Sequence, residues 1–350
     1  MGESYDAARI ERGDVSEVGR KLAAGFTLER GQLFVAALVT DAGGKQTILM
    51  IAHHLVVDLV SWRFLHEELE RLLSGQTLEA APYPFTRWAE DLAKTLVSEA
   101  DRQFWQTQPP SVALPIERHR TNDVQSADTV HVTLTETTTR TLQREVVSKV
   151  RGRLEDVLLT ALGQALCHWA SGSAVAIDLE GHGRPEGGEV EQTIGWFTTI
   201  TPITVQRERD PMVALKTTKE MLRTVAAHEH AYMLLRQGDE LAGAASEVLF
   251  NYLGRIHFDT SNIPDVHPKN DRGHALQVSA VLRDEALTLT VDYSREQFDR
   301  RTIENLVARY STYLDELAAA LTASGAGATP SDFAAVELDQ AAIDEVMRQS

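Results

Sequence analysis

Residues 53–62 read HHLVVDLVSW and follow the apolar run TILMIA at 47–52. This stretch is open to three interpretations: a metal site, a satisfied piece of core, or a catalytic base. Successive side chains of a strand point to opposite faces, so we expect His53 and His54 to diverge. Adjacent histidines on opposite faces cannot easily share one metal ion, and no HxxxH or CxxC spacing lies nearby. The metal interpretation is therefore the least favoured.

The surroundings of this motif predict two strands, a tight corner and a helix. QLFVAALVT at 32–40 and TILMIAHH at 47–54 are typical of buried strands, and the glycine-containing DAGGKQ between them indicates a hairpin turn. From Leu59 onward, apolar residues recur at helical spacing as far as Gly75. Asp58 precedes this helix and is expected to cap it or to hold a buried cation. Its predicted role is thus geometric.

Length and composition limit the possible classes of protein. The chain has 350 residues, more than one hydrophobic core usually serves, so two lobes are expected. Hydrophobic residues are 43% and charged residues 24%, and no apolar run approaches the ~18 residues of a membrane span. One cysteine and a polar N-terminus predict a cytoplasmic protein without disulfides. A net charge of -17 argues against nucleic acid or a membrane surface as partner.

Beyond the first helix the pattern mixes strands and helices, which predicts two α/β lobes. Several prolines between 82 and 115 indicate a boundary near residues 115–130, with one helix predicted over 85–108. The expected strands lie at 129–135, 195–205, 246–254, 274–284 and 286–294, and 174–184 is expected to be a strand that runs into a glycine-rich turn. The expected helices are 154–172, 210–227 and 301–323, and GAGATPSDF at 325–333 is typical of a linker.

Two later stretches place polar residues at strand ends. In IDLEGHGRPEGG at 177–188, a strand delivers Glu180 before Gly181 and Gly183, whose lack of a side chain permits close backbone approach to a ligand. The alternative is a surface polar loop, and no phosphate-binding glycine motif is present. In VLFNYLG at 248–254, Asn251 and Tyr252 interrupt an apolar run, which alone indicates only a half-buried tyrosine.

Together, these stretches resemble the condensation-domain superfamily of nonribosomal peptide synthetases, and within it the epimerization domains. HHLVVDLVSW matches the HHxxxDxxSW signature that the superfamily shares with chloramphenicol acetyltransferase-like enzymes. The blocks typical of epimerization domains are DVLLTALG at 156–163, EGHGR at 180–184, TIGWFTTITP at 193–202 and FNYLGR at 250–255. The resemblance runs from about residue 10 to 335 and includes TPSDF at 329–333. It implies an α/β fold (an α+β sandwich) of two chloramphenicol acetyltransferase-like lobes around a central cleft.

The resemblance also implies a domain division and reveals departures from the family. Residues 1–125 would form a partial N-terminal lobe carrying HHxxxD, residues 126–335 a C-terminal lobe carrying EGHGR, GWFT and FNYLG, and 336–350 a tail. The family's PIQxWF-like opening does not occur, so an incomplete N-terminal lobe is expected. Its glycine-rich PxxGxGYG stretch corresponds to VAAHEHAYM at 225–233, where the glycines are gone, and Pro185 follows EGHGR.

The activity that the resemblance implies is cofactor-independent L/D epimerization at the α-carbon of a carrier-bound aminoacyl or peptidyl thioester. Its acid/base groups would be His54 and Glu180, with Tyr252 as a third catalytic residue. A histidine titrates near pH 6.5, whereas a carboxyl with a pKa near 4.3 needs partial burial to donate a proton. The supporting residues would be His53, Asp58, Trp62, Arg184 and Asn251.

The implied partners follow from this chemistry. The protein itself would hold no cofactor or metal, and its substrate would be carried on the phosphopantetheine of a peptidyl or aminoacyl carrier protein. Neighbouring synthetase modules or a second copy of the chain are further expected partners. One alternative is a stand-alone relative that performs cyclization, elimination, or amide or ester formation. Another is an inactive docking or scaffold module, against which the joint presence of the candidate catalytic residues speaks.

Three minor expectations concern residues outside these motifs. Cys167 lies in an apolar helix and is expected to be a core thiol rather than a nucleophile. Lys216, Lys219 and Arg223 share one helix face, which is expected to be solvated or to dock an acidic carrier protein. The two histidines of HEH at 228–230 are expected to be exposed.

Overall fold

The computed structural model describes residues 8–78, 83–185, 190–238, 240–241, 246–255, 266–323, 327–333, 340 and 343. The chain divides into two compact units, and each is described by itself. The first contains the residues before Leu96 together with His182–Thr198, and the second contains Leu96–Gly181, Thr199–Ile256 and the chain from Pro268. The sequence suggested a single boundary near residue 125. In the structure each unit is instead made of several separate stretches of the chain, and residues 182–198 belong to the first unit.

The first unit is built on a three-stranded sheet. β1 is parallel to the central β2, which pairs antiparallel with β3. Its elements are β1 (Ala8–Arg12), α1 (Val15–Ala23), β2 (Phe34–Thr40), β3 (Gln46–Ala52), α2 (Leu59–Leu73) and α3 (Phe85–Ala93), with short 3₁₀ turns at Leu28–Arg30 and His54–Val56. The predicted hairpin and the helix after it are confirmed; β1 and α1 were not predicted.

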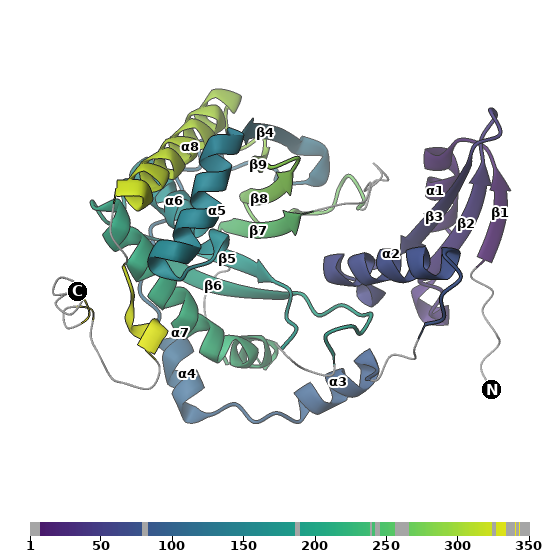
Figure 1. Cartoon of the computed structure of the whole chain (residues 1–350), viewed down its shortest axis with the longest axis horizontal. Helices are drawn as coiled ribbons and strands as arrows, with labels where there is room; N and C mark the ends of the chain where they lie inside the picture. Colours follow the sequence, from purple (N-terminus) through teal and green to yellow (C-terminus); the bar gives the residue numbers. More distant parts are fainter. Residues whose placement is uncertain are drawn as a thin grey trace. The chain divides into compact units, whose positions relative to one another are not determined.

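The second unit is built on a six-stranded mixed sheet in the order β4-β9-β8-β7-β5-β6 (Figure 1). The strands are β4 (Ala127–Thr133), β5 (Ala174–Gly181), β6 (Thr199–Gln206), β7 (Val248–Arg255), β8 (Leu276–Arg283) and β9 (Ala286–Ser294). β5, β7 and β8 run parallel, so their C-terminal ends meet at one edge of the sheet.

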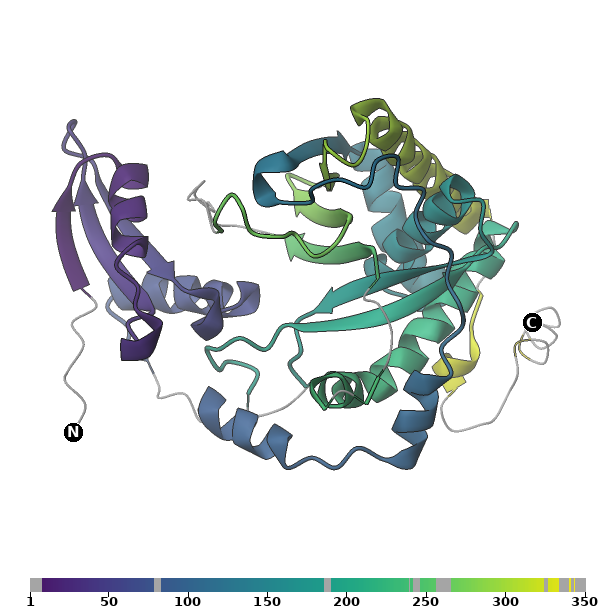
Figure 2. The same ribbon diagram turned by 180° about the vertical axis from the view of Figure 1, so that it is seen from behind.

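Helices of the second unit cover the sheet and hold the main core. They are α4 (Glu99–Gln106), α5 (Glu136–Val150), α6 (Leu154–Trp169), α7 (Pro211–Gln237) and α8 (Arg300–Ala323), with 3₁₀ turns at Val124–Ser126 and Pro330–Phe333. α5, α6 and α8 pack on one another and against the sheet (Figure 2). A Cβ on Gly163 of α6 would lie 2.3 Å from the Val205 side chain, so a glycine is needed where helix and sheet approach closely.

Two predicted helices differ from the observed ones. The helix predicted over 85–108 is divided into α3 and α4, because Ser98 and Asp101 form a capping box that begins a new helix. The helix predicted over 210–227 continues to Gln237. The stretch 225–233, where the resembling family carries glycines, is therefore continuous helix here. With no glycine or proline between 212 and 237, nothing in the sequence interrupts it.

Two expectations for the C-terminal part are wrong. The predicted linker docks on α7: Thr329 is fully buried, and both carboxylate oxygens of Asp332 lie 2.8 Å from Lys219 Nζ. Lys219 is only 1% exposed and also donates to the Val150 carbonyl at 2.6 Å. The basic face predicted on this helix is thus not a solvated stripe. The predicted tail at 336–350 lies outside the described residues, apart from positions 340 and 343.

Candidate functional site

The first half of the HHLVVDLVSW motif forms a capped turn. β3 ends at Ala52, so the strand predicted through His54 is two residues too long and neither histidine lies in it. The His53 backbone N–H donates to the Leu33 carbonyl at 2.8 Å, and His53 Nδ1 accepts the Leu55 N–H at 3.2 Å. His53 therefore caps the 3₁₀ turn that begins at His54.

His54 is an exposed imidazole supported by one aromatic neighbour. Its ring centroid lies 5.1 Å from that of Trp196, with the planes tilted by 54°. This contact leaves the ring accessible for proton exchange while limiting its orientation. An apolar pocket of the same unit is lined by Phe34, Ala52, Val56, Val57, Leu65 and Ile194. No local sequence pattern indicated that Trp196 would contact His54.

Asp58 combines the two geometric roles expected of it. Its Oδ1 accepts the Ser61 N–H at 2.7 Å and caps α2. Its carboxylate also receives a two-pronged contact from Arg184, at 2.7 and 3.1 Å, and the Phe197 N–H at 3.1 Å. Asp58 is 3% and Arg184 6% exposed, so this ion pair is buried. Hydrogen bonds between ionised partners of this geometry are the strong ones in proteins.

Ser61, which sequence reasoning did not single out, joins three segments. Its fully buried hydroxyl donates to the Gly195 carbonyl at 2.9 Å and accepts from the Gly195 N–H at 3.1 Å and from Arg184 at 2.9 Å. The Arg184 guanidinium also donates to the Thr193 carbonyl and lies 4.2 Å from the centre of the Phe197 ring. Arg184 of the EGHGR block and the GWFT block are thus hydrogen-bonded to the start of α2.

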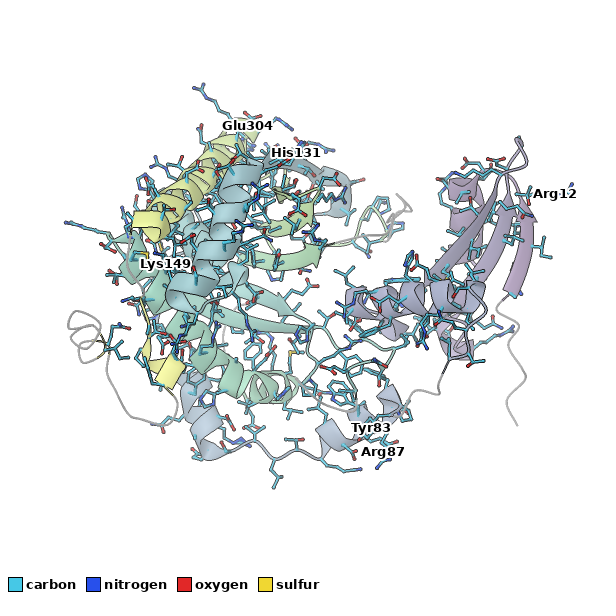
Figure 3. The ribbon with its side chains drawn as sticks, in the orientation of Figure 1. Arg12, Tyr83, Arg87, His131, Lys149 and Glu304 are labelled. Carbon is cyan, nitrogen blue, oxygen red and sulfur yellow. The ribbon has the colours of Figure 1, made fainter. Side chains whose placement is uncertain are left out.

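Residues at the start of α3 also contact this hydrogen-bonded network. Figure 3 labels Tyr83 and Arg87, whose guanidinium lies 5.0 Å from the Tyr83 ring. The Tyr83 carbonyl accepts the Thr193 hydroxyl at 2.6 Å. Phe85 packs edge-on against Phe197 at 5.0 Å between centroids. Trp62, predicted to pack this helix corner, is half-buried in the first turn of α2.

Replacing Gly195 by alanine should destabilise the first unit. A Cβ there would lie 2.3 Å from Cδ2 of Phe85 and 3.0 Å from the Phe197 ring. Overpacking of this kind costs about 1–3 kcal/mol. Denaturant unfolding measures this cost, with Gly238→Ala as control because its Cβ would meet nothing nearer than 3.4 Å. Equal stability of both variants would show that this close contact does not constrain the network.

In the second unit, Glu180 and Asn251 are direct neighbours. They face each other across the parallel pair β5 and β7, Glu180 at the C-terminal end of β5 and Asn251 in the middle of β7, and both are half-buried. Paired residues share a face of the sheet, and the next residue points to the other face. Tyr252 accordingly lies on the opposite face from Glu180, packed against the main core beside the helices.

The helix-covered face carries a titratable group that the sequence did not indicate. Burial, followed by the neighbouring Asp156, raises the pKa of Glu155 to about 7. Burial and then Glu155 raise the pKa of Tyr252 above its usual value. Asp156 is compensated differently, since it accepts from Arg223 at 3.2 and 2.9 Å and from the Arg153 N–H at 2.7 Å. Two adjacent carboxyls thus have contrasting surroundings.

The remaining single-residue expectations have mixed outcomes. Cys167 is fully buried and burial raises its pKa to about 11, which confirms a core thiol. His228 was expected to be exposed but is half-buried, with Nδ1 2.7 Å from Asp101 and its ring stacked on Phe104 at 4.2 Å. His230 is exposed, as predicted.

Among the residues that the structure describes, no group of three or more histidine, cysteine, aspartate or glutamate side chains is arranged to bind a metal ion. None of the helices described is both long and apolar enough to span a bilayer.

Comparison with known proteins identifies similar sequences. The family model described as "Condensation domain" matches residues 4–332. A linear gramicidin synthase of Brevibacillus parabrevis is 36% identical over 380 aligned positions, which cover 96% of this chain and 5% of that protein. Chondramide synthase cmdD of Chondromyces crocatus is 33% identical, covering 95% of this chain and 9% of that protein. The chain therefore spans a small part of these relatives.

Solved structures of condensation and epimerization domains are similar to this chain. The epimerization domain from the third module of tyrocidine synthetase B superposes with a TM-score of 0.81 and 30% identity, covering 92% of this chain and 82% of that one. The condensation domain of the Monacolin K polyketide synthase has a TM-score of 0.70 at 16% identity, covering 89% and 79%, which shows the fold alone. These similarities confirm the predicted mixed α/β, chloramphenicol acetyltransferase-like fold.

Proposed function

The chain belongs to the condensation-domain family, and on that premise we propose that it interconverts the L and D configurations at the α-carbon of a carrier-bound aminoacyl or peptidyl thioester. One observation carries the proposal. The buried pair Asp58–Arg184 joins the histidine motif to the EGHGR block, and the GWFT block packs on both. The similarity to an epimerization domain at 30% identity supports the same choice.

The reaction removes a proton from one side of the α-carbon and returns one to the other. We propose His54 and Glu180 as the two acid/base groups: one accepts the α-proton as the C–H bond breaks, and the other donates its proton as the new C–H bond forms. The electron pair rests meanwhile on the thioester enolate. Hydrogen-bond donors aimed at the enolate oxygen lower the barrier, a role that we assign to Asn251 beside Glu180. Tyr252, expected from the resemblance to be catalytic, lies on the other face of the sheet and is given no direct contact with the enolate.

The proposed reaction determines which cofactors and partner proteins would be required. No electrons leave the substrate, so the step itself requires no redox group. The thioester would be presented on the phosphopantetheine arm of a carrier protein, either separate or in a neighbouring synthetase module. His53, Asp58, Trp62 and Arg184 would act through position only, because they hold the turn and the helix beside His54.

One observation favours a second candidate function. The stretch 225–233, which is glycine-rich in the resembling family, is continuous helix in this chain and carries Glu229 and His230. A changed surface there is compatible with a different substrate. The second candidate is another acid/base step on a pathway intermediate, namely cyclization, elimination, or amide or ester formation.

Incubation in deuterated water separates these functions. Aminoacyl and dipeptidyl thioesters of pantetheine and of a carrier protein are each incubated with the protein and analysed by mass spectrometry and chiral chromatography. Epimerization predicts one deuterium, at the α-carbon bonded to the thioester carbonyl, and a mixture of configurations at that carbon. A product of different mass or a closed ring, without α-deuterium, would support the second candidate. Unchanged substrate throughout would favour an inactive scaffold.

A further inference from the structure

A group of carboxyl and hydroxyl side chains surrounds the strand end next to Glu180. A Cβ on Gly181 would lie 3.2 Å from Oε1 of Glu229 and 2.9 Å from the Thr199 hydroxyl. That hydroxyl donates a short hydrogen bond to Glu229. Glu229 therefore reaches from α7 to the backbone that immediately follows Glu180.

Strand alternation defines the face on which this group lies. Glu180 and Gly181 are successive residues of β5, so they face opposite sides of the sheet. Gly181 pairs with Thr199, and Thr201 lies two residues further along the same face of β6. The face is the one covered by α6, whose first turn carries Glu155.

Thr201 supplies an independent sign that this face accommodates a ligand. The residue is 2% exposed, and its Oγ1 has no hydrogen-bond partner among the described residues. A buried hydroxyl without a partner is costly to a fold, so such groups call for a specific explanation. Thr201 lies two residues from Thr199 along β6, so both hydroxyls are on the face of the sheet that Glu229 contacts.

The carboxyl groups around Glu155 outnumber the neighbouring guanidinium groups by one. Glu155, Asp156 and Glu229 face two guanidinium groups, those of Arg153 and Arg223, and Arg223 is already bound to Asp156. Burial first, then Asp156, raises the pKa of Glu155 to about 7, and Glu229 acts in the same direction. Near neutral pH the excess negative charge is thus partly balanced by a proton, which an external cation could replace.

We propose that Glu155 and Glu229, with the hydroxyls of Thr199 and Thr201, bind an ammonium group on the side chain of the substrate. Primary ammonium donates three hydrogen bonds, and carboxylate and hydroxyl oxygens are suitable acceptors. The inference rests on the proposed function, in which Glu180 acts at the α-carbon. Because Glu180 lies on the other face of the sheet, the cation must be separated from the α-carbon by a flexible stem, as in lysine.

The test compares two side chains that differ in charge but hardly in shape. Binding of the pantetheine amides of lysine and of norleucine is measured by calorimetry, which is independent of turnover. We expect the lysyl amide to bind about 10- to 100-fold more tightly, since hydrogen bonds to charged groups carry effects of this size. Glu155→Gln and Glu229→Gln should each remove most of the difference, and Thr201→Val part of it. Glu136→Gln, an exposed carboxyl in the first turn of α5, should leave it unchanged.

The pH dependence provides a second criterion. The lysine ammonium remains charged well above pH 9, whereas Glu155 ionises as the pH rises through about 7. The ratio of the affinities for the lysyl and norleucyl amides should therefore increase between pH 6 and 8 in the unmodified protein. In Glu155→Gln this ratio should not change with pH.

The outcomes separate this inference from the proposed function. Equal binding of the two amides, or no binding of either, would overturn the ammonium site even if both thioesters exchange deuterium. A lysyl preference that depends on Glu155 and Glu229 would support the site even if neither thioester exchanges. Circular dichroism establishes whether each variant is folded. If Glu155→Gln does not fold, the lysyl preference of Glu229→Gln and Thr201→Val tests the ammonium site.

Discussion

Replacing His54 by alanine should lower the rate of α-proton exchange by about 10²- to 10⁴-fold, the usual contribution of a positioned acid/base group. The ring is exposed and contacts Trp196, so its removal should cost little stability. Deuterium incorporation into the thioester measures the effect. His131→Ala is the matched control, because this histidine is also exposed but lies on β4 (Figure 3).

Glu180→Gln should produce a loss of the same order. Glutamine preserves the shape of the side chain and its place beside Asn251, but it cannot exchange a proton. If both His54→Ala and Glu180→Gln retain full exchange, neither residue is an acid/base group and the site assignment is wrong. Loss in only one variant would limit the acid/base role to that residue.

The second large effect concerns the buried ion pair. Asp58→Ala leaves the Arg184 guanidinium buried without its carboxylate, and breaking a buried pair in this way costs about 3–5 kcal/mol. The variant should also lose exchange activity, because the turn carrying His54 directly precedes Asp58. Denaturant unfolding monitored by tryptophan fluorescence gives the free energy of unfolding.

A control within the same unit isolates the ion pair from helix capping. Asp14 caps α1 through the Glu17 N–H at 3.1 Å but is exposed to solvent, so Asp14→Ala should cost only about 1 kcal/mol. The double change Asp58→Ala with Arg184→Met should cost less than the two single changes together. Additive effects would show that the pair does not couple the two segments energetically.

Sequence patterns predicted the elements whose hydrophobic period is regular and missed those held by tertiary contacts. β2, β3 and α2 follow plain apolar patterns. β1 has a mostly polar sequence and is held by pairing with β2. The first turn of α5 carries three threonines after Glu136, and threonine favours helix poorly, yet the helix forms because Leu142, Val146 and Val150 are buried.

The candidate site was predictable in its motif residues but not in their partners. Asp58 could be recognised as a cap from its position before an apolar period. The Ser61 contact with Gly195 joins residues 134 positions apart, and no local pattern encodes such a separation. The raised pKa of Glu155 likewise arises from the way α6 and α7 pack, so the sequence shows only an acid near a helix start.

The most direct test of the account follows where the label appears at early times. The L-thioester and, separately, the D-thioester are incubated with the protein in deuterated water and sampled before equilibrium. Two groups on opposite sides of the α-carbon predict that the inverted product carries deuterium while the remaining substrate does not, in both directions. Deuterium appearing without inversion, inverted product without deuterium, or no exchange from either isomer would contradict the proposed two-base epimerization.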